Sequence, residues 1–187
     1  GERNKGERIT MNALIVWGGW DGHTPKETAE LLAAGLRENG VAVRVENSLQ
    51  PLEDVEALKA LDLIVPVWTM GDMSDAQWQG LHQAVQDAGV GLGGVHGGMG
   101  DAFRNRLDYQ WMVSGQFLGH PYVGPYTVRV RQPKNVIMEG LPKQFDYSSE
   151  QYYMQVDPGI DVLADTVYSY EGQAVNMPVV WVKSWGK

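Results

Sequence analysis

The sequence predicts an α/β fold with a mostly parallel sheet, because short apolar strands alternate with amphipathic helices over the first half of the chain. Residues 13–17 are a fully apolar run, typical of a strand buried on both faces of a sheet. Further strand candidates follow at 41–45, 63–67 and 90–95. Helical periodicity between these strands predicts helices on both faces. We therefore expect a flavodoxin-like three-layer sandwich.

Capping sequences mark two of the expected helix starts. Thr24-Pro25-Lys26-Glu27 has threonine at the N-cap, proline at the first helical position and glutamate at the third. Ser74-Asp75-Ala76-Gln77 has the same capping-box pattern. Asn39-Gly40 and Gly89 are typical helix ends. A further helix is expected near 52–60.

The pattern changes after Tyr126, where residues 126–131 alternate like a half-buried strand. Residues 162–168 and 178–182 are further strand candidates, with loops between them. We see no repeat and no linker in the sequence, so we predict one domain over residues 11–187. The polar, aperiodic residues 1–10 are expected to be a flexible or non-native tail, with Met11 as the natural start.

The composition excludes several function classes. A chain of 187 residues with 43% hydrophobic residues fits one folded domain. Its formal net charge of −8 opposes binding to nucleic acid or an anionic membrane, since both favour a basic face. The absence of cysteine excludes disulfides, thiolate ligands and a cysteine nucleophile. The sequence shows no apolar run of membrane-spanning length and no signal peptide, so a cytoplasmic location is expected.

Glycine, aromatic and titratable residues gather where the predicted parallel strands end. These segments are 17–23, 68–71 and 95–98. In open α/β sheets, ligands bind outside the carboxyl ends of the strands. We therefore expect a site there that includes Trp68, with Trp20 and Asp21 on the first of the loops.

His96 stands at a strand-to-helix turn with glycine pairs on both sides. Such a turn resembles a nucleophile elbow, which lifts one side chain into a pocket. Imidazole suits acid–base work, hydrogen bonding or metal ligation better than covalent catalysis. The structural alternative is that His96 caps the following helix.

His23 and His120 lie in predicted loops, and Glu150 adds a carboxylate. His23 precedes a helix N-terminus, which favours an anionic or oxygen-rich ligand, although it could equally have no role. Together with His96, these residues could hold a divalent metal such as zinc, but none of their spacings is that of a tight ligand motif. His82, by contrast, shares a helical face with Trp78 and is expected to be structural.

Glu150 is followed by Gln151, Tyr152 and Tyr153. Tyrosine faces beside carboxylates and amides are typical of carbohydrate sites, where sugar rings stack and hydroxyls need paired donors and acceptors. The alternative is an aromatic core strand with Glu150 at its exposed start.

Four segments together resemble the trehalose-utilisation (ThuA-like) family. They are Gly18-Gly19-Trp20-Asp21-Gly22-His23, Val95-His96-Gly97-Gly98, Gly115-Gln116-Phe117 with His120-Pro121, and Ser149-Glu150-Gln151-Tyr152-Tyr153. The resemblance runs from about Met11 to the end of the chain. It implies the class I glutamine amidotransferase-like fold and the catabolism of a carbohydrate, such as a keto-disaccharide or a related glycoside. It does not imply glutamine hydrolysis, because His96 stands where the amidotransferase elbow carries cysteine.

The chain departs from the pattern of that family at three places. Asn135-Val136 stands where relatives tend to have His-Pro, and Gln155 stands where many have histidine. The chain also stops at Lys187, where relatives continue into another strand and helix. The missing histidines favour a second hypothesis, a non-catalytic carbohydrate-binding or regulatory domain.

The leading hypothesis is an enzyme that acts on a keto-glycoside by hydrolysis, elimination or isomerisation. His96, Glu150, His23 and His120 are the expected catalytic residues, with Glu150 as base and a histidine as acid, or the reverse. A small-molecule carbohydrate is the expected partner, and the chain could form a homo-oligomer. The expected substrate-binding residues are Trp20, Asp21, Trp68, Gly97, Gln116 and Tyr152.

Overall fold

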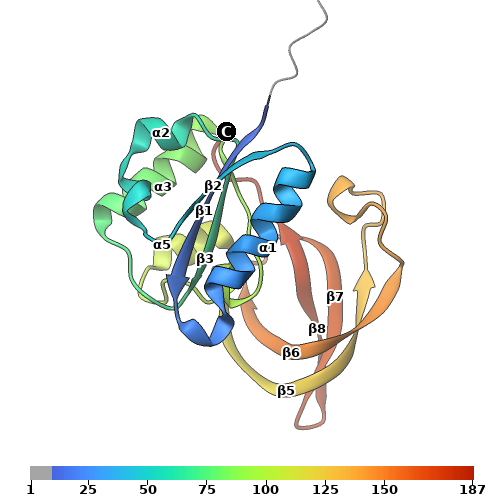
Figure 1. Cartoon of the computed structure of the whole chain (residues 1–187). Coiled ribbons are helices and arrows are strands. Elements are labelled where there is room, and N and C mark those ends of the chain that lie inside the picture. The colour runs from blue at the N-terminus through green and yellow to red at the C-terminus, as the bar shows by residue number, and fades with distance from the viewer. Residues whose placement is uncertain (1–9) are drawn as a thin grey trace, which may run out of the picture. The chain divides into compact units, whose positions relative to one another are not determined.

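The computed structural model describes residues 10–187, which form two compact units (Figure 1). The described residues up to Asn105, together with Trp185–Lys187, form the N-terminal unit, and Arg106–Ser184 form the C-terminal unit. The expected tail falls almost wholly on residues 1–9, outside the described residues. Within residues 10–187, no helix has the length and apolar character needed to cross a membrane. The expectation of one domain stays a prediction.

The N-terminal unit is built on a parallel sheet with the strand order β2-β1-β3-β4. Its strands are β1 (Asn12–Gly19), β2 (Ala42–Glu46), β3 (Leu63–Thr69) and β4 (Gly91–Leu92). Its α-helices are α1 (Pro25–Glu38), α2 (Val55–Lys59), α3 (Asp75–Ala88) and α4 (Gly97–Gly100), with 3-10 turns η1 (Asp21–His23) and η2 (Gln50–Glu53). The element order confirms the predicted alternation.

Both faces of this sheet are buried. Ile15 of β1 and Val65 of β3 pack against Ala29 of α1. Because side chains alternate along a strand, Leu14 and Ile64 point to the opposite face, where they are also buried. Figure 1 shows α2 and α3 across the sheet from α1. The N-terminal unit therefore has the helix–sheet–helix layering that the sequence predicts.

Two local predictions in this unit need correction. Thr24 is in the left-handed region (φ 46°), and in the described chain its side chain makes no capping hydrogen bond to α1, so the first capping box is wrong. Proline at the first position still starts the helix. The fourth strand is also shorter than residues 90–95, because the chain leaves the sheet after Leu92 to form the turn at His96.

The second capping box is confirmed. The Ser74 hydroxyl accepts a hydrogen bond from the Gln77 backbone N–H at 3.1 Å, and the Gln77 side chain accepts from the Ser74 N–H at 2.9 Å. Gly89 then ends α3 in the left-handed conformation (φ 71°). Both ends of α3 are thus encoded locally, as the sequence indicates.

We expect Ser74→Ala to lower the free energy of unfolding by about 1 kcal/mol, because it leaves one N-terminal N–H of α3 without its cap. Urea unfolding measures the change. Ser48→Ala is a useful comparison, since the Ser48 hydroxyl accepts from Gln50 N–H in a turn before the short η2. An equal or larger loss at Ser48 would contradict the special role assigned to the α3 cap.

The C-terminal unit contains an antiparallel sheet with the order β6-β5-β7-β8. Its elements are α5 (Leu107–Val113), β5 (Gly115–Val130), η3 (Val136–Met138), β6 (Gln144–Val156), β7 (Asp161–Tyr170) and β8 (Gln173–Val182). Val128 and Leu163 lie in one buried cluster, and Met154 and Tyr168 in another. The fold is therefore mixed α/β, with one parallel and one separate antiparallel sheet. A three-layer sandwich around a mostly parallel central sheet is confirmed only in part.

Most residues of β5 and β6 were expected to form loops. Residues 115–125 are strand rather than loop, and β6 includes Glu150 and Tyr152. The alternative reading of an aromatic strand around Glu150 was therefore closer to the structure. The strands predicted at 162–168 and 178–182 are confirmed within β7 and β8.

Candidate functional site

In the N-terminal unit, His23 and His96 lie side by side. Their ring centroids are 4.7 Å apart and their planes are inclined by 71°. His23 Nδ1 also lies 2.8 Å from the Thr69 hydroxyl oxygen, in the last residue of β3. The loop after β1 and the turn after β4 thus meet at the carboxyl end of the parallel sheet, as the strand-end rule predicts.

The backbone at His96 is strained. Its φ of 53° and ψ of −148° lie in a region that residues with a side chain rarely adopt. The following turn is closed by Gly100 N–H, which donates to His96 O at 2.9 Å. Among the described residues the His96 side chain makes no capping hydrogen bond to α4, and it is exposed. The geometry therefore favours the elbow interpretation over the helix-cap interpretation.

The absence of a side chain at Gly97 lets the His23 ring approach the turn. A Cβ at Gly97 would lie 2.6 Å from His23 Cε1 and 3.1 Å from the Thr69 hydroxyl. Such contacts are too short for either neighbour to stay in place. Gly97 thus fixes the spacing of the two imidazoles, while Trp20 closes the other side of His23 with ring centroids 4.8 Å apart.

An ion pair between a buried aspartate and a half-exposed arginine anchors the segment that follows α4. Asp101 is 2% exposed and accepts two hydrogen bonds from Arg104, each 2.7 Å long. Its backbone oxygen accepts from Met70 N–H at 2.7 Å. This ties the turn after His96 to the end of β3. Charge-assisted, bidentate hydrogen bonds of this kind hold a backbone in one geometry.

In the C-terminal unit, His120 and Glu150 form a second pair. The distance from His120 Nε2 to Glu150 Oε1 is 3.4 Å, with both side chains partly exposed. The pair depends on a register shift in β5: Gly119 lies opposite Tyr153, and Tyr122 opposite Gln151. His120 and Pro121 therefore share a single partner residue on β6, which is a β-bulge. Bulges often re-aim a side chain beside an active site.

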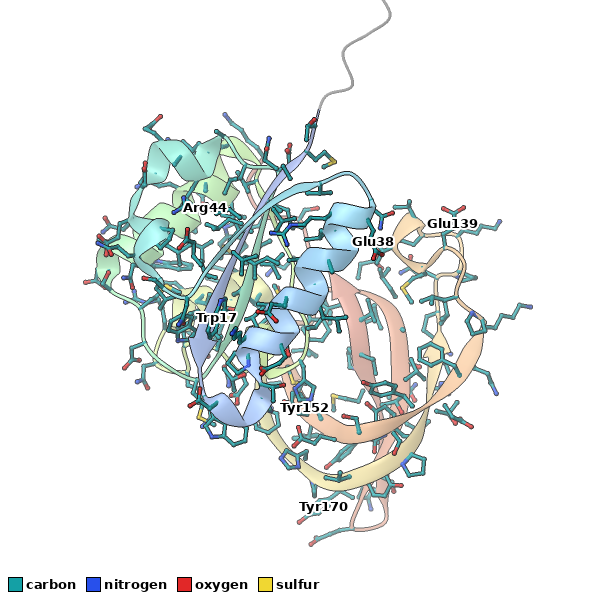
Figure 2. All side chains as sticks on the ribbon, in the orientation of Figure 1. Trp17, Glu38, Arg44, Glu139, Tyr152 and Tyr170 are labelled. Carbon is teal, nitrogen blue, oxygen red and sulfur yellow. The ribbon has the colours of Figure 1, made fainter. Side chains whose placement is uncertain are left out.

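Aromatic rings surround this second pair. Tyr152, labelled in Figure 2, lies nearly parallel to the His120 ring, with centroids 6.3 Å apart and planes 19° apart. Phe117 lies 4.4 Å from the Tyr152 ring. The Gln116 amide is turned to the backbone and donates to Phe117 O at 3.0 Å. The pair of titratable groups thus stands at the edge of an aromatic surface.

The predicted residues fall into two groups. The N-terminal unit brings together His23, His96, Gly97 and Trp20, and the C-terminal unit brings together His120, Glu150 and Tyr152. Asp21 lies in η1. Trp68 lies near the end of β3, where Gly18, Gly19 and Gly71 leave room for its indole.

Two further side chains, His82 and Thr69, complete this account. His82 stacks on Trp78 with ring centroids 5.0 Å apart and contacts Trp185, in keeping with the structural role expected for it. Sequence reasoning missed Thr69, whose only signal is a hydroxyl at the end of an apolar strand.

The fold of the chain is similar to that of a glutaminase domain. A glutaminase domain of CTP synthase from Trypanosoma brucei, with bound acivicin, matches 90% of this chain and 79% of its own, with 12% identity and a TM-score of 0.51. That likeness concerns the fold alone. In this chain His96 lies at the turn after β4, and the sequence contains no cysteine that could serve as a nucleophile.

The chain belongs to the ThuA family, described as trehalose utilisation, whose model matches residues 12–187. A ThuA-like protein from Bacteroides uniformis has a TM-score of 0.74 and 17% identity, covering 97% of this chain and 81% of that one. Another from Parabacteroides merdae has a TM-score of 0.71 and 16% identity, covering 95% and 76%. No curated protein matches the chain. The family places the chain in carbohydrate metabolism.

Proposed function

We propose that this protein acts on a sugar or keto-disaccharide by acid–base chemistry of histidine and glutamate side chains. The observation that carries the proposal is the pair of His120 and Glu150 beside Tyr152, because an imidazole and a carboxylate can transfer protons and an aromatic face can stack on a sugar ring. The trehalose-utilisation family supports the carbohydrate class. The proposed substrate-binding residues are Trp20, Asp21, Trp68, Gly97, Gln116 and Tyr152.

The proposed chemistry begins next to the keto group. A carboxylate such as Glu150 takes the proton from the carbon beside the carbonyl, and an imidazole donates a proton to the oxygen that gains charge. His120 can act as that acid, or the two residues can exchange roles. From the resulting enediol or enol, reprotonation gives isomerisation, and loss of a neighbouring glycosidic oxygen gives elimination.

His23 and His96 offer a second proton-transfer pair. His96 stands exposed on its strained turn, and the hydrogen bond between His23 Nδ1 and the Thr69 hydroxyl fixes the His23 ring. Fixing one nitrogen of an imidazole sets which nitrogen faces the substrate. We propose His96 as the residue of this pair that touches the sugar.

A divalent cation such as zinc is the cofactor that these side chains would accept. Imidazole nitrogens and carboxylate oxygens are zinc ligands, so His23, His96, His120 and Glu150 are the candidate ligands. When bound, such an ion would polarise the substrate carbonyl. The proton transfers above are assigned to this chain's own residues, and metal content is measured separately.

Replacing Glu150 by Gln tests the proposal. Glutamine keeps the size and an acceptor oxygen but cannot take up a proton, so turnover of a keto-disaccharide should fall about a hundredfold. His120→Asn should cost a similar factor. The double variant should lose less than the product of the two losses, because paired groups act as a unit.

Glu139→Gln provides the matched control, since Glu139 is a glutamate of the same unit that follows η3 (Figure 2). Its turnover should match that of the unmodified protein. The binding-only alternative predicts no turnover of any keto-disaccharide by the unmodified chain. That result, obtained with the metal-reconstituted protein as well, would overturn the proposed enzymatic function.

A further inference from the structure

The antiparallel sheet of the C-terminal unit divides into two strand pairs, because the part of β5 that precedes Val128 is not paired with β7. β5 pairs with β7 only through Val128, Arg129 and Val130, although both strands continue. Past that point the Gln151 side chain of β6 donates to the Val167 backbone oxygen of β7 at 3.0 Å. This amide supplies a bond that a neighbouring strand would otherwise make. The two strand pairs β5–β6 and β7–β8 thus part around a polar side chain.

A groove of about 480 Å³ lies in this fork. Its volume falls within the range typical of small-molecule sites, about 300–1,000 Å³. Beneath it, Gln151 also donates to the Thr166 hydroxyl at 3.0 Å, which in turn donates to Thr127 O at 2.8 Å. Around it lie tyrosines, hydroxyl groups and one arginine. The lining includes Tyr122, Tyr126, Thr127, Arg129, Gln151 and Ser169.

Tyr122 is held as a rigid wall of the groove. Its hydroxyl donates to Pro125 O at 2.9 Å, yet the side chain as a whole is 42% exposed. Gly124, with φ of 154°, makes this fold-back possible, because a Cβ there would lie 2.8 Å from the Tyr122 hydroxyl oxygen. An exposed ring fixed before any ligand arrives lowers the entropy cost of stacking on it.

The charged groups beside the groove are already engaged with one another. Arg129, the cation of its lining, donates from Nε to Asp165 Oδ1 at 3.0 Å, and Arg131 Nε lies 3.4 Å from the other oxygen of this carboxylate, which is 5% exposed. None of the described residues that line the groove is a carboxylate. Burial, and secondly Tyr147, raise the pKa of Tyr126, so its hydroxyl stays protonated at neutral pH.

We propose that this groove binds a neutral saccharide, at a subsite separate from the candidate catalytic residues. A tyrosine wall with hydroxyl and amide groups matches the apolar faces and hydroxyls of a sugar. Side chains alternate along β6, so Gln151 points to the face opposite Glu150 and Tyr152. The groove can therefore hold a sugar without occupying the His120–Glu150 pair. This inference rests on the proposed function for its choice of saccharides.

The test titrates trehalose, maltose and sucrose into the unmodified protein, because these sugars have no free keto group and are therefore not substrates of the proposed reaction. The NMR chemical shifts of the backbone amides of Tyr122 and Gln151 should change with at least one of the three sugars. Tyr122→Ala should weaken that binding about tenfold, the loss of one aromatic stacking partner. Tyr122→Phe keeps the ring but loses the hydrogen bond to Pro125. Its loss of affinity should be several-fold smaller than that of Tyr122→Ala.

Tyr170→Ala is the matched control, because Tyr170 is an exposed tyrosine at the end of β7 that does not line the groove (Figure 2). Its sugar affinity should be unchanged. Tyr122→Ala should retain turnover of a soluble keto-disaccharide. The proposal that the groove binds a saccharide would be overturned by either of two results. One is the absence of sugar-induced chemical-shift changes at Tyr122 and Gln151, and the other is equal sugar affinity in the Tyr122→Ala and Tyr170→Ala variants. Turnover by the unmodified protein would then still support the proposed function.

Discussion

Replacing His96 by Asn should reduce turnover of a keto-disaccharide by a hundredfold or more, with little change in the melting temperature. Acid–base catalysis by a positioned side chain contributes roughly 10²–10⁴-fold in rate. Asparagine cannot act as an acid or base near neutral pH, so this contribution should be lost. Asparagine also tolerates positive φ better than most residues, so the strained turn at φ 53° should survive. The measurement is kcat on a keto-disaccharide, with thermal unfolding of the same samples.

His82→Asn is the control for this experiment. The substitution is identical, but His82 stacks on Trp78 in α3 and is outside the proposed site. It should leave turnover intact and lower stability, the reverse of the His96 result. If His96→Asn changes neither turnover nor sugar affinity nor metal content, His96 has a structural role and the elbow interpretation is wrong.

The parallel sheet was predictable because its strands are encoded locally. A strand buried on both faces must be apolar at nearly every position, as residues 13–17 are, and this signal does not depend on the partner strand. The order of alternating elements then places strand ends at one edge. The meeting of His23 and His96 follows from that rule. The contact of His23 with Thr69 needs the packed sheet and could not be predicted.

The antiparallel ribbon of β5 and β6 was not predictable from local pattern. Gly119, Pro121, Gly124 and Pro125 interrupt β5, and such residues normally argue against a strand. Register shifts on either side of Gly119 accommodate Gly119 and Pro121, whereas Gly124 and Pro125 stay in register with Ser149 and Ser148 of β6. His120 and Glu150 were both candidate residues from the sequence, but their pairing depends on this bulge.

The largest loss of stability is expected from Gly80→Ala. Gly80 is buried in α3 where the helix crosses η2, and a Cβ there would lie 1.8 Å from the Leu52 backbone oxygen. Backbone atoms cannot rotate away, so α3 and η2 must separate. Overpacking of this kind costs about 2–3 kcal/mol, and outweighs the helix propensity of alanine, which favours the substitution by about 1 kcal/mol. The net loss is about 1–2 kcal/mol, so the melting temperature should fall by roughly 2–8 °C.

Gly35→Ala should have the opposite sign and serves as the matched control. Gly35 is also within a helix, α1, but a Cβ there would meet no atom within 4 Å. Only the propensity gain remains, so the free energy of unfolding should rise by about 0.5–1 kcal/mol. Urea unfolding of both variants measures the difference. If both alanines stabilised the protein equally, the close packing of α3 on η2 would be contradicted, because that contact is what distinguishes the two helical glycines.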